Sequence, residues 1–364
     1  MRWPTCCSGR SDAEPTTAAA ETEPAQGTEE TDPAENGGDA TMDEMPGEGV
    51  TVRIGRATWD TGWFQAEIFA SLLSELGYET EAIDPLDNPI FYQSAAQGDI
   101  DMWANGWFPL HNTYLEDAAV ADNVELVGYE VKAGAIQGYL IDKKTADEHG
   151  ITNLGDLQDP EIAALFDGDG NGLADLFGCD PGWGCELVIN HQIEAYELTD
   201  TVEHIQGSYN AIMGDVVARF QRGEPVLFYT WTPNWTVGMM IPGQDVVWLE
   251  VPFPSLPEDQ MANADATIVE GVEGCAGDAD PCEMGWEPND IRVVANKAFL
   301  DANPSAHALF EQVEIPLVDI LVQNAKMFEG EDNDEDIQRH AEEWIEENRD
   351  QVDMWLDAAR GASS

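Results

Sequence analysis

Apolar residues fall into alternating and helical patterns from about residue 50 onward, and these patterns predict a chain in which strands alternate with helices. Val50, Val52 and Ile54 alternate with polar residues, as in a half-buried strand. The apolar residues of 64–76 recur at helical spacing, and Gly77 is placed to end that helix. Three further elements follow: a strand over 78–83, a helix over 89–97 and a strand over 99–104. This order predicts a parallel, doubly wound sheet, whose ligands bind at the carboxyl ends of the strands.

A second set of elements begins near 135–141 and predicts a second α/β lobe. Its predicted elements are helices over 186–198 and 209–221 and strands over 226–230 and 246–251. The tail turns helical again, because Ile337, Ala341 and Ile345 form one apolar stripe. We therefore expect two α/β lobes with a ligand cleft between them.

Residues 1–48 differ in composition from the rest of the chain and predict a disordered acidic tether. The segment 11–48 is rich in Ala, Glu, Thr, Pro and Gly and holds twelve acidic residues and no Lys or Arg. Such a segment buries too little apolar area to offset the entropy lost on ordering. Before it, Cys6 and Cys7 are followed by small residues, which resembles the start of a mature bacterial lipoprotein. We expect Cys7 to be lipidated, although no hydrophobic signal segment precedes it here; a fragment without a role is the alternative.

The charge balance is strongly acidic and excludes one class of partner. Asp and Glu number 72 against 15 Lys and Arg, which gives a formal net charge of −57. A nucleic-acid partner is not expected, because phosphate binding needs clustered Lys and Arg. At low salt such a surface repels itself, whereas at about 1 M salt the Debye length falls to roughly 3 Å and screens the repulsion. The composition therefore predicts salty surroundings; an acidic protein of an ordinary organism is the alternative.

The six cysteines form three close pairs, and none has the C-x-x-C spacing of zinc or thioredoxin-like motifs. Beyond Cys6 and Cys7, Cys179 is paired with Cys185 and Cys275 with Cys282. Short loops closed by paired cysteines fit disulfides formed in an oxidising compartment, so we expect a bond in each of these two pairs. Buried free thiols are the alternative.

Three tryptophans stand in unusual local settings. Trp107 follows a predicted strand, Trp183 precedes a predicted helix, and Trp231 stands at the end of a predicted strand. All three are predicted to lie in loops at strand ends, where an α/β cleft binds its ligand. A core tryptophan more often lies inside an element, among periodic apolar residues. The set therefore predicts a shared site, with separate core or surface positions as the alternative.

From about Val50 to the C-terminus the chain resembles the substrate-binding proteins of glycine betaine/proline betaine ABC transporters. The resemblance rests on long runs rather than on a short motif: QGYLIDKKTAD at 137–147, CDPGWGCELVINHQ at 179–192, YTWTP at 229–233 and DVVWL at 245–249. It implies the type II periplasmic-binding-protein fold, an α/β fold whose two doubly wound lobes close over a ligand at a hinge. Residues 49–141 with 288–364 would form lobe 1, and residues 142–287 would form lobe 2. It also implies an extracytoplasmic, monomeric protein that delivers a betaine to an ABC permease, without catalysis and without a cofactor. A sensor that signals to a membrane receptor is the alternative.

The resemblance assigns the ligand residues. They are the box tryptophans Trp107, Trp183 and Trp231, the carboxylate-binding His111, and the backbone donors Gly184 and Cys185. Elementary chemistry agrees, because a trimethylammonium group has no N–H and is recognised only by size and diffuse charge, which aromatic faces provide. Gly184 and Cys185 lie where a helix is predicted to begin, so their N–H groups and the helix dipole favour a carboxylate. Glycine betaine, proline betaine, dimethylsulfoniopropionate and ectoine fit this description, and choline, which lacks the carboxylate, fits it less well.

Other features leave alternatives open. An enzyme is not expected, because the sequence lacks a G-x-S-x-G elbow, a P-loop, a clear dinucleotide fingerprint and a metal-spaced His cluster. The segment from Asp167 to Asp175 copies the first half of a calcium loop, but Gly178 stands where the bidentate glutamate belongs, so a plain acidic turn is the main interpretation. Trp59 and Trp63 fit either the mouth of the cleft or ordinary packing.

Overall fold

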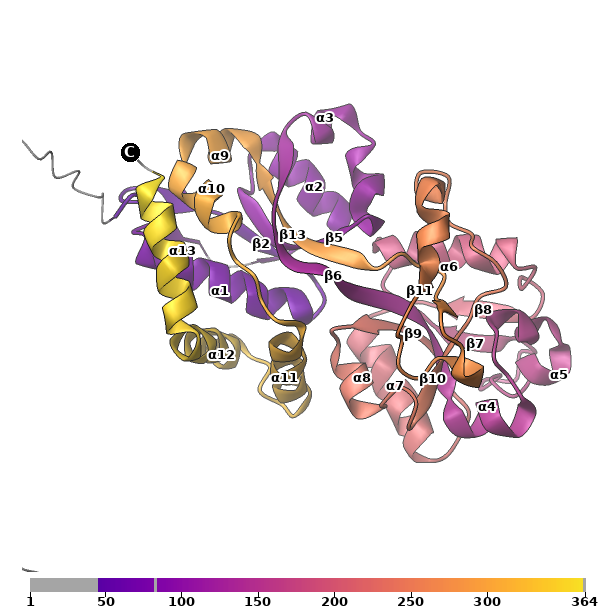
Figure 1. Cartoon of the computed structure of the whole chain (residues 1–364). Coiled ribbons are helices and arrows are strands. Elements are labelled where there is room, and N and C mark those ends of the chain that lie inside the picture. The colour runs from indigo at the N-terminus through magenta and orange to yellow at the C-terminus, as the bar shows by residue number, and fades with distance from the viewer. Residues whose placement is uncertain (1–44, 82–83, 363–364) are drawn as a thin grey trace, which may run out of the picture. The chain divides into compact units, whose positions relative to one another are not determined.

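The computed structural model describes residues 45–81 and 84–362, so Cys7 and residues 1–44 of the predicted tether lie outside the described residues. The prediction of a disordered tether is wrong for residues 45–48, which belong to an ordered turn whose Gly47 N–H donates to the Leu76 carbonyl at 2.9 Å. Within them, nine strands form one mixed sheet in the order β4-β2-β5-β13-β6-β9-β7-β8, with β10 also paired to β6 (Figure 1). The strands of this sheet are β2 (Ile54–Arg56), β4 (Asp84–Pro85), β5 (Met102–Phe108), β6 (Val124–Asp142), β7 (Ala174–Phe177), β8 (Val202–Ile205), β9 (Leu227–Thr232), β10 (Val246–Leu249) and β13 (Asn289–Asn296). Two short pairs lie apart from it: β1 (Thr51–Val52) with β3 (Glu79–Thr80), and β11 (Ile268–Val269) with β12 (Cys282–Glu283).

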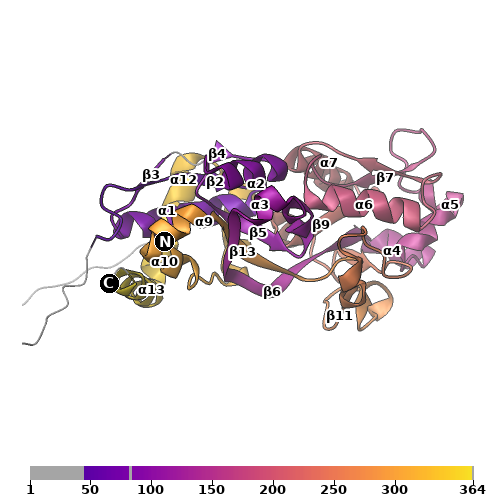
Figure 2. The same cartoon turned by 90° about the horizontal axis from the view of Figure 1, so that it is seen from above.

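Strand β6 joins two halves of the sheet. Up to Ala135 its partner is β13, and from Ile136 to Asp142 its partners are β9 and β10. All of these pairings are antiparallel, whereas β2 is parallel to β4 and β5, and β7 is parallel to β8 and β9. Figures 1 and 2 show β6 running from one group of helices to the other. The predicted parallel arrangement is therefore confirmed for β2 and β5, and the long connecting strands make the whole sheet mixed.

Helices cover both halves. Those packed with the first half are α1 (Thr61–Glu75), α2 (Asn88–Gln97), α3 (Ala118–Ala121), α9 (Lys297–Ala302), α10 (Pro304–Phe310), α12 (Asp334–Glu347) and α13 (Arg349–Gly361). Helix α11 (Leu317–Phe328) packs against both α1 and α8 (Trp235–Met239). The second half carries α4 (Lys143–His149), α5 (Pro160–Ala163), α6 (Gly184–Ala195), α7 (Tyr209–Gln221) and α8 (Trp235–Met239). Short 3₁₀ turns occur at Leu110–Leu115, Leu154–Gln158, Met261–Thr267 and Ala276–Asp278. None of the described helices combines the length and the apolar character that crossing a bilayer requires.

The apolar patterns of the sequence correspond to buried faces. Helix α1 ends where predicted, with Gly77 in the left-handed region at φ 89°. The stripe of Ile337, Ala341 and Ile345 is buried on α12, which packs against α1. Helix α7 has the predicted bounds, whereas the strand predicted over 99–104 starts at Met102 and runs on to Phe108 because β13 pairs with its last residues.

The acidic surface generates a prediction about stability. With 72 acidic and 15 basic residues, charge repulsion opposes the folded state until salt screens it. We expect the Tm to rise by several degrees (~5 °C or more) between about 0.1 and 2 M NaCl, most of it below about 1 M, where the Debye length approaches 3 Å. Thermal unfolding followed by circular dichroism measures this, with an uncharged osmolyte as the control. A Tm that stays flat or falls with salt would contradict the prediction.

Candidate functional site

One cavity brings all six predicted ligand residues together. Its lining among the described residues comprises Trp59, Asn88, Trp107, Leu110, His111, Gln137, Trp183, Gly184, Cys185, Tyr229 and Trp231. The cavity is small, with a volume of about 30 Å³, far below the roughly 300–1,000 Å³ usual for ligand pockets, so its walls must separate to admit a ligand. Although the chain is strongly acidic, none of these lining residues is Asp or Glu. A lining of this composition suits a small ligand with much apolar surface.

Three tryptophan rings contribute to the wall of the cavity. The centroid of the Trp231 ring lies 6.4 Å from that of Trp107 and 5.8 Å from that of Trp183, and both ring pairs are nearly perpendicular. Each side chain is only 4% exposed. Trp107 comes from the first half of the sheet and the other two from the second half, so the wall is built by both halves.

The prediction that all three tryptophans lie in loops is wrong for two of them. Trp107 lies inside β5 and Trp231 inside β9, whereas Trp183 precedes α6 as predicted. The strands extend past the predicted ends because Trp107 pairs with Ile291 and Trp231 with Gln137. Both partners are far away in the sequence, so local patterns could not reveal these extensions.

Trp59 adds a fourth ring to the cavity. Its side chain is 6% exposed, and its ring centroid lies 5.1 Å from that of Trp183 in an edge-to-face arrangement. From the sequence, Trp63 has the same two interpretations as Trp59. In the structure the Arg56 guanidinium carbon lies 4.1 Å from the Trp63 ring centroid, and Trp63 is not among the lining residues. The structure therefore distinguishes the two tryptophans, which the sequence did not.

The N-terminus of α6 supplies backbone donors at the cavity. Helix α6 begins at Gly184, and the first N–H groups of a helix have no acceptor within it. Gly184 and Cys185 both line the cavity, so the positive end of the helix dipole lies at this wall. A Cβ atom at Gly184 would come within 2.7 Å of the Leu110 side chain, so only glycine allows this close approach.

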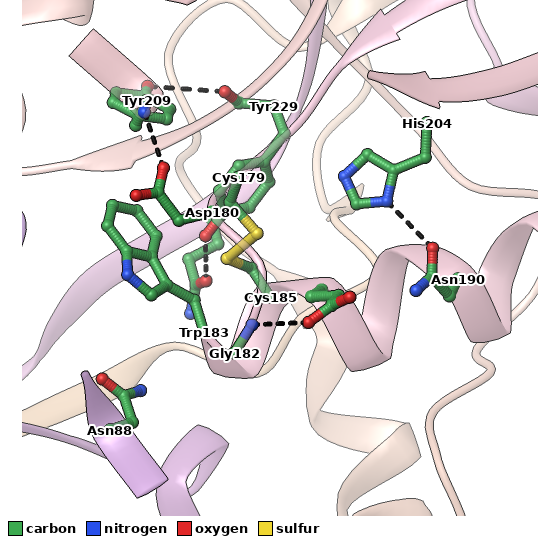
Figure 3. The surroundings of a disulfide bond; sticks show 12 residues. Asn88, Cys179, Asp180, Gly182, Trp183, Cys185, Asn190, His204, Tyr209 and Tyr229 are labelled. Atoms are coloured by element: carbon green, nitrogen blue, oxygen red, sulfur yellow. Dashed lines mark hydrogen bonds between the residues drawn. A yellow bond between two sulfur atoms is a disulfide. The ribbon is translucent and has the colours of Figure 1, made fainter. Parts of the chain in front are cut away.

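A disulfide and several hydrogen bonds hold the turn that carries Trp183. Cys179 and Cys185 are joined as predicted, and the bond lies directly behind the turn (Figure 3). The Asp180 carboxylate accepts from the Tyr209 backbone N–H at 2.6 Å, and the Gly182 N–H donates to Glu186 at 2.6 Å. These bonds fix the turn before any ligand arrives, which reduces the entropy lost on binding.

His111 is neutral, and its proton is held on one nitrogen. The side chain is 2% exposed, and burial lowers its pKa to about 3. The backbone N–H of Trp107 lies 3.2 Å from Nδ1 and can only donate, so Nδ1 is the acceptor and Nε2 carries the proton. Nε2 lies 3.1 Å from the Asn88 side-chain nitrogen, which is also a donor, so no hydrogen bond joins the two groups while the proton is on Nε2. An acceptor that contacts both N–H groups would satisfy this corner of the cavity.

Comparison with known families identifies the chain. Residues 50–347 match the family model described as the substrate binding domain of the ABC-type glycine betaine transport system. The chain belongs to this family. Its members are substrate-binding proteins of ABC transporters rather than enzymes, in agreement with the absence of catalytic motifs in the sequence.

Individual relatives and solved structures agree with this family. The chain is 44% identical to the glycine betaine-binding periplasmic protein OusX of Dickeya dadantii, over 88% of this chain and 93% of that protein. It is also 44% identical to the glycine betaine/proline betaine-binding periplasmic protein of Escherichia coli, over the same shares. A binding protein of Borrelia burgdorferi for glycine betaine and L-proline matches with a TM-score of 0.66 at 19% identity, over 86% of this chain and all of that one. Lactococcal OpuAC, closed around glycine betaine, matches with a TM-score of 0.63 at 17% identity, over 84% and 99%. The type II periplasmic-binding-protein fold is therefore established.

Two features lie apart from the cavity of this family member. Cys275 and Cys282 form the second predicted disulfide. In the possible calcium loop, carboxylate oxygens of Asp167, Asp169 and Asp175 come within 4.8 Å of one another. However, Asp175 pairs with Arg219 at 2.9 Å, and Asp167 accepts from backbone N–H groups of its own turn. These bonds fit the acidic-turn interpretation.

Sequence reasoning missed several lining residues. Asn88 begins α2, and Gln137 lies in β6. Leu110 comes shortly after Trp107, and Tyr229 comes shortly before Trp231. Gln137 and Tyr229 lie within the sequence runs that resemble the family, and their place in those runs is the signal that could have identified them. Asn88 gave none, because an asparagine at the start of a helix is ordinarily a cap.

The geometry of His111 generates a prediction. Because burial holds its pKa near 3, we expect its imidazole to stay neutral from about pH 8 to pH 5, with the proton on Nε2. ¹⁵N NMR of the imidazole nitrogens distinguishes the protonation states and tautomers directly. The exposed His149 is the internal control. A His111 midpoint near 6.5, or a proton on Nδ1, would contradict the account.

Proposed function

We propose that this chain is the extracytoplasmic substrate-binding component of an ABC importer, and that its cavity holds glycine betaine or a closely related quaternary-ammonium zwitterion. The observation that carries the proposal is the set of tryptophan rings around a cavity without acidic residues. Both relatives named above carry glycine betaine in their names, at 44% identity over most of the chain. The proposed role is osmoprotective import, without chemistry on the ligand.

The aromatic walls suit the trimethylammonium group. Such a group has no N–H to donate, and each cation–π contact contributes roughly 0.5–2 kcal/mol once water is excluded, with Trp the strongest partner. A carboxylate would also attract the cation, but it would bind simple inorganic cations as well. The lining avoids that competition, because its residues are aromatic or neutral. This selectivity would matter most in salty surroundings, which the charge of −57 predicts.

The polar groups of the cavity lining suit the ligand carboxylate. Gly184 and Cys185 offer backbone N–H groups at a helix N-terminus, and His111 offers Nε2–H. Asn88 adds an amide N–H beside it. Three aromatic contacts and several charge-assisted hydrogen bonds, less the entropy of association, predict micromolar affinity, about −8 kcal/mol.

The two halves of the sheet are proposed to act as lobes, with residues 49–141 and 288–364 in lobe 1 and 142–287 in lobe 2. Hydrogen bonds already join them around the cavity. Trp183 Nε1 donates to Thr58 Oγ1 at 2.9 Å, and the Tyr114 hydroxyl donates to the Gly182 carbonyl at 2.9 Å. These contacts fit lobes that close over the ligand and exclude water. The closed form would then be presented, as a monomer, to a membrane permease.

Attachment to the membrane is a further part of the proposal. Lipidation of Cys7 would leave the acidic segment up to about residue 44 as a tether between membrane and binding protein. Mass spectrometry of the intact mature protein tests it, because a diacylglyceryl group adds a defined mass at one cysteine. A mature protein that lacks Cys7 or carries it unmodified would remove this part of the proposal and leave the binding function untouched.

Isothermal titration tests the ligand and the site together. In about 2 M salt, where surface charge is screened, we expect micromolar binding of glycine betaine and weaker binding of choline. Trp183→Ala should reduce the affinity about tenfold or more, because one cation–π face and the ordering of the α6 N-terminus are lost. Trp63→Ala is the matched control, since it removes a tryptophan outside the cavity lining. Native protein that ignores millimolar betaine would refute the function, and binding that survives Trp183→Ala would place the site elsewhere.

A further inference from the structure

One buried asparagine connects two of the tryptophans that line the cavity. Asn105 lies in β5 and is fully buried. Its Oδ1 atom accepts from Trp59 Nε1 at 2.6 Å and from Trp107 Nε1 at 2.8 Å. Its side-chain nitrogen donates to the Gln65 side-chain oxygen, so the amide is held from behind as well. One oxygen atom thus fixes the indole edges of two rings.

This connection restricts how the two rings can turn. An indole that rotates about its Cβ–Cγ bond moves Nε1 away from Asn105 and leaves a buried N–H without an acceptor, which is unfavourable. When an indole N–H donates a hydrogen bond, electron density also shifts from the N–H into the ring. This shift strengthens the negative face that a cation meets. Asn105 therefore affects both the orientation of the rings and their attraction for a cation.

The other two rings are held differently. Trp183 donates to Thr58, which belongs to the other half of the sheet, so this bond depends on how the halves approach. Trp231 Nε1 is buried without a hydrogen-bond partner in the described part of the chain. Trp59, Trp107 and Asn105 instead all belong to the first half, as does Gln65 on α1. Their arrangement does not require the second half, so it can exist before the lobes close.

We propose that Asn105 is a positioning residue that holds Trp59 and Trp107 as a preformed wall for the cationic head group and so sets the preference for cations over neutral groups of the same shape. The inference rests on the proposed function, because it assigns a role within that same cavity. Asn105 does not line the cavity, and it acts through the two indoles. Preforming one wall lowers the entropy lost on binding.

The test compares two ligands of the same shape. Glycine betaine and its neutral carbon isostere, 3,3-dimethylbutanoate, differ only in whether the head group is charged, and both carry the carboxylate. The measured quantity is the ratio of their dissociation constants, from isothermal titration in about 2 M salt. We expect the native protein to prefer glycine betaine by about tenfold or more, as three or four aromatic contacts imply.

The variants separate positioning from structural support. Asn105→Leu removes the shared acceptor and should reduce the ratio at least about fivefold, mainly through weaker betaine binding. Asn105→Asp keeps acceptor oxygens for both indoles. The Gln65 side-chain nitrogen, which has no hydrogen-bond partner among the described residues, can turn to donate to the new carboxylate, so this variant should keep the native ratio or exceed it. Asn296→Ala is the control, because it removes another buried asparagine of the same half, away from the cavity lining. Asn105→Ser, which leaves room for a water molecule, gives the same comparison if the Leu variant does not fold.

The outcomes distinguish this inference from the proposed function. A native protein that binds glycine betaine, with a ratio that Asn105→Leu or Asn105→Ser leaves unchanged, overturns the role of Asn105 alone. A ratio that falls as much in Asn296→Ala also overturns it, because the effect would then be general destabilisation. A native protein that binds neither ligand overturns the proposed function and this inference with it.

Discussion

The face of an indole ring attracts a cation only weakly, and water or a poorly aimed ring removes much of that attraction. A site built from such faces needs several rings, a dry interior and fixed ring planes. The cavity meets these requirements with Trp59, Trp107, Trp183 and Trp231, all nearly buried and in mutual edge-to-face contact. The surrounding structure supplies the fixed planes: strand pairing holds Trp107 and Trp231, and a disulfide-closed turn holds Trp183.

The polar groups proposed to bind the ligand carboxylate are also uncharged. A cationic side chain would attract the ligand carboxylate but would also repel the ligand's own ammonium group. The structure instead places backbone N–H groups of a helix N-terminus there, beside a histidine that burial keeps uncharged. Gly184 allows that helix to approach Leu110 closely, so donors and rings share one small space. In a chain of net charge −57, the binding cavity is lined without a single carboxylate among the described residues.

The sequence predicted the local elements well, and the parts that it missed depend on distant pairing. Periodicity placed α7 and the buried stripe of α12 because each is decided by spacing within one helix. It ended β5 and β9 too early, because their last residues are strands only through pairing with Ile291 and Gln137. The family resemblance supplied the six predicted ligand residues that meet in the cavity. It did not supply Asn88, Trp59 or Asn105, whose positions beside the cavity depend on three-dimensional packing.

The measurement that tests the central claim most directly is a crystal structure of the protein with glycine betaine, grown in high salt. The account predicts the trimethylammonium group within about 6 Å of the ring centroids of Trp107, Trp183 and Trp231. It also predicts the carboxylate against the N–H groups of Gly184 and Cys185 and the Nε2 of His111. A ligand bound outside this cavity, or one whose carboxylate faces the tryptophans while its ammonium group faces α6, would contradict the account.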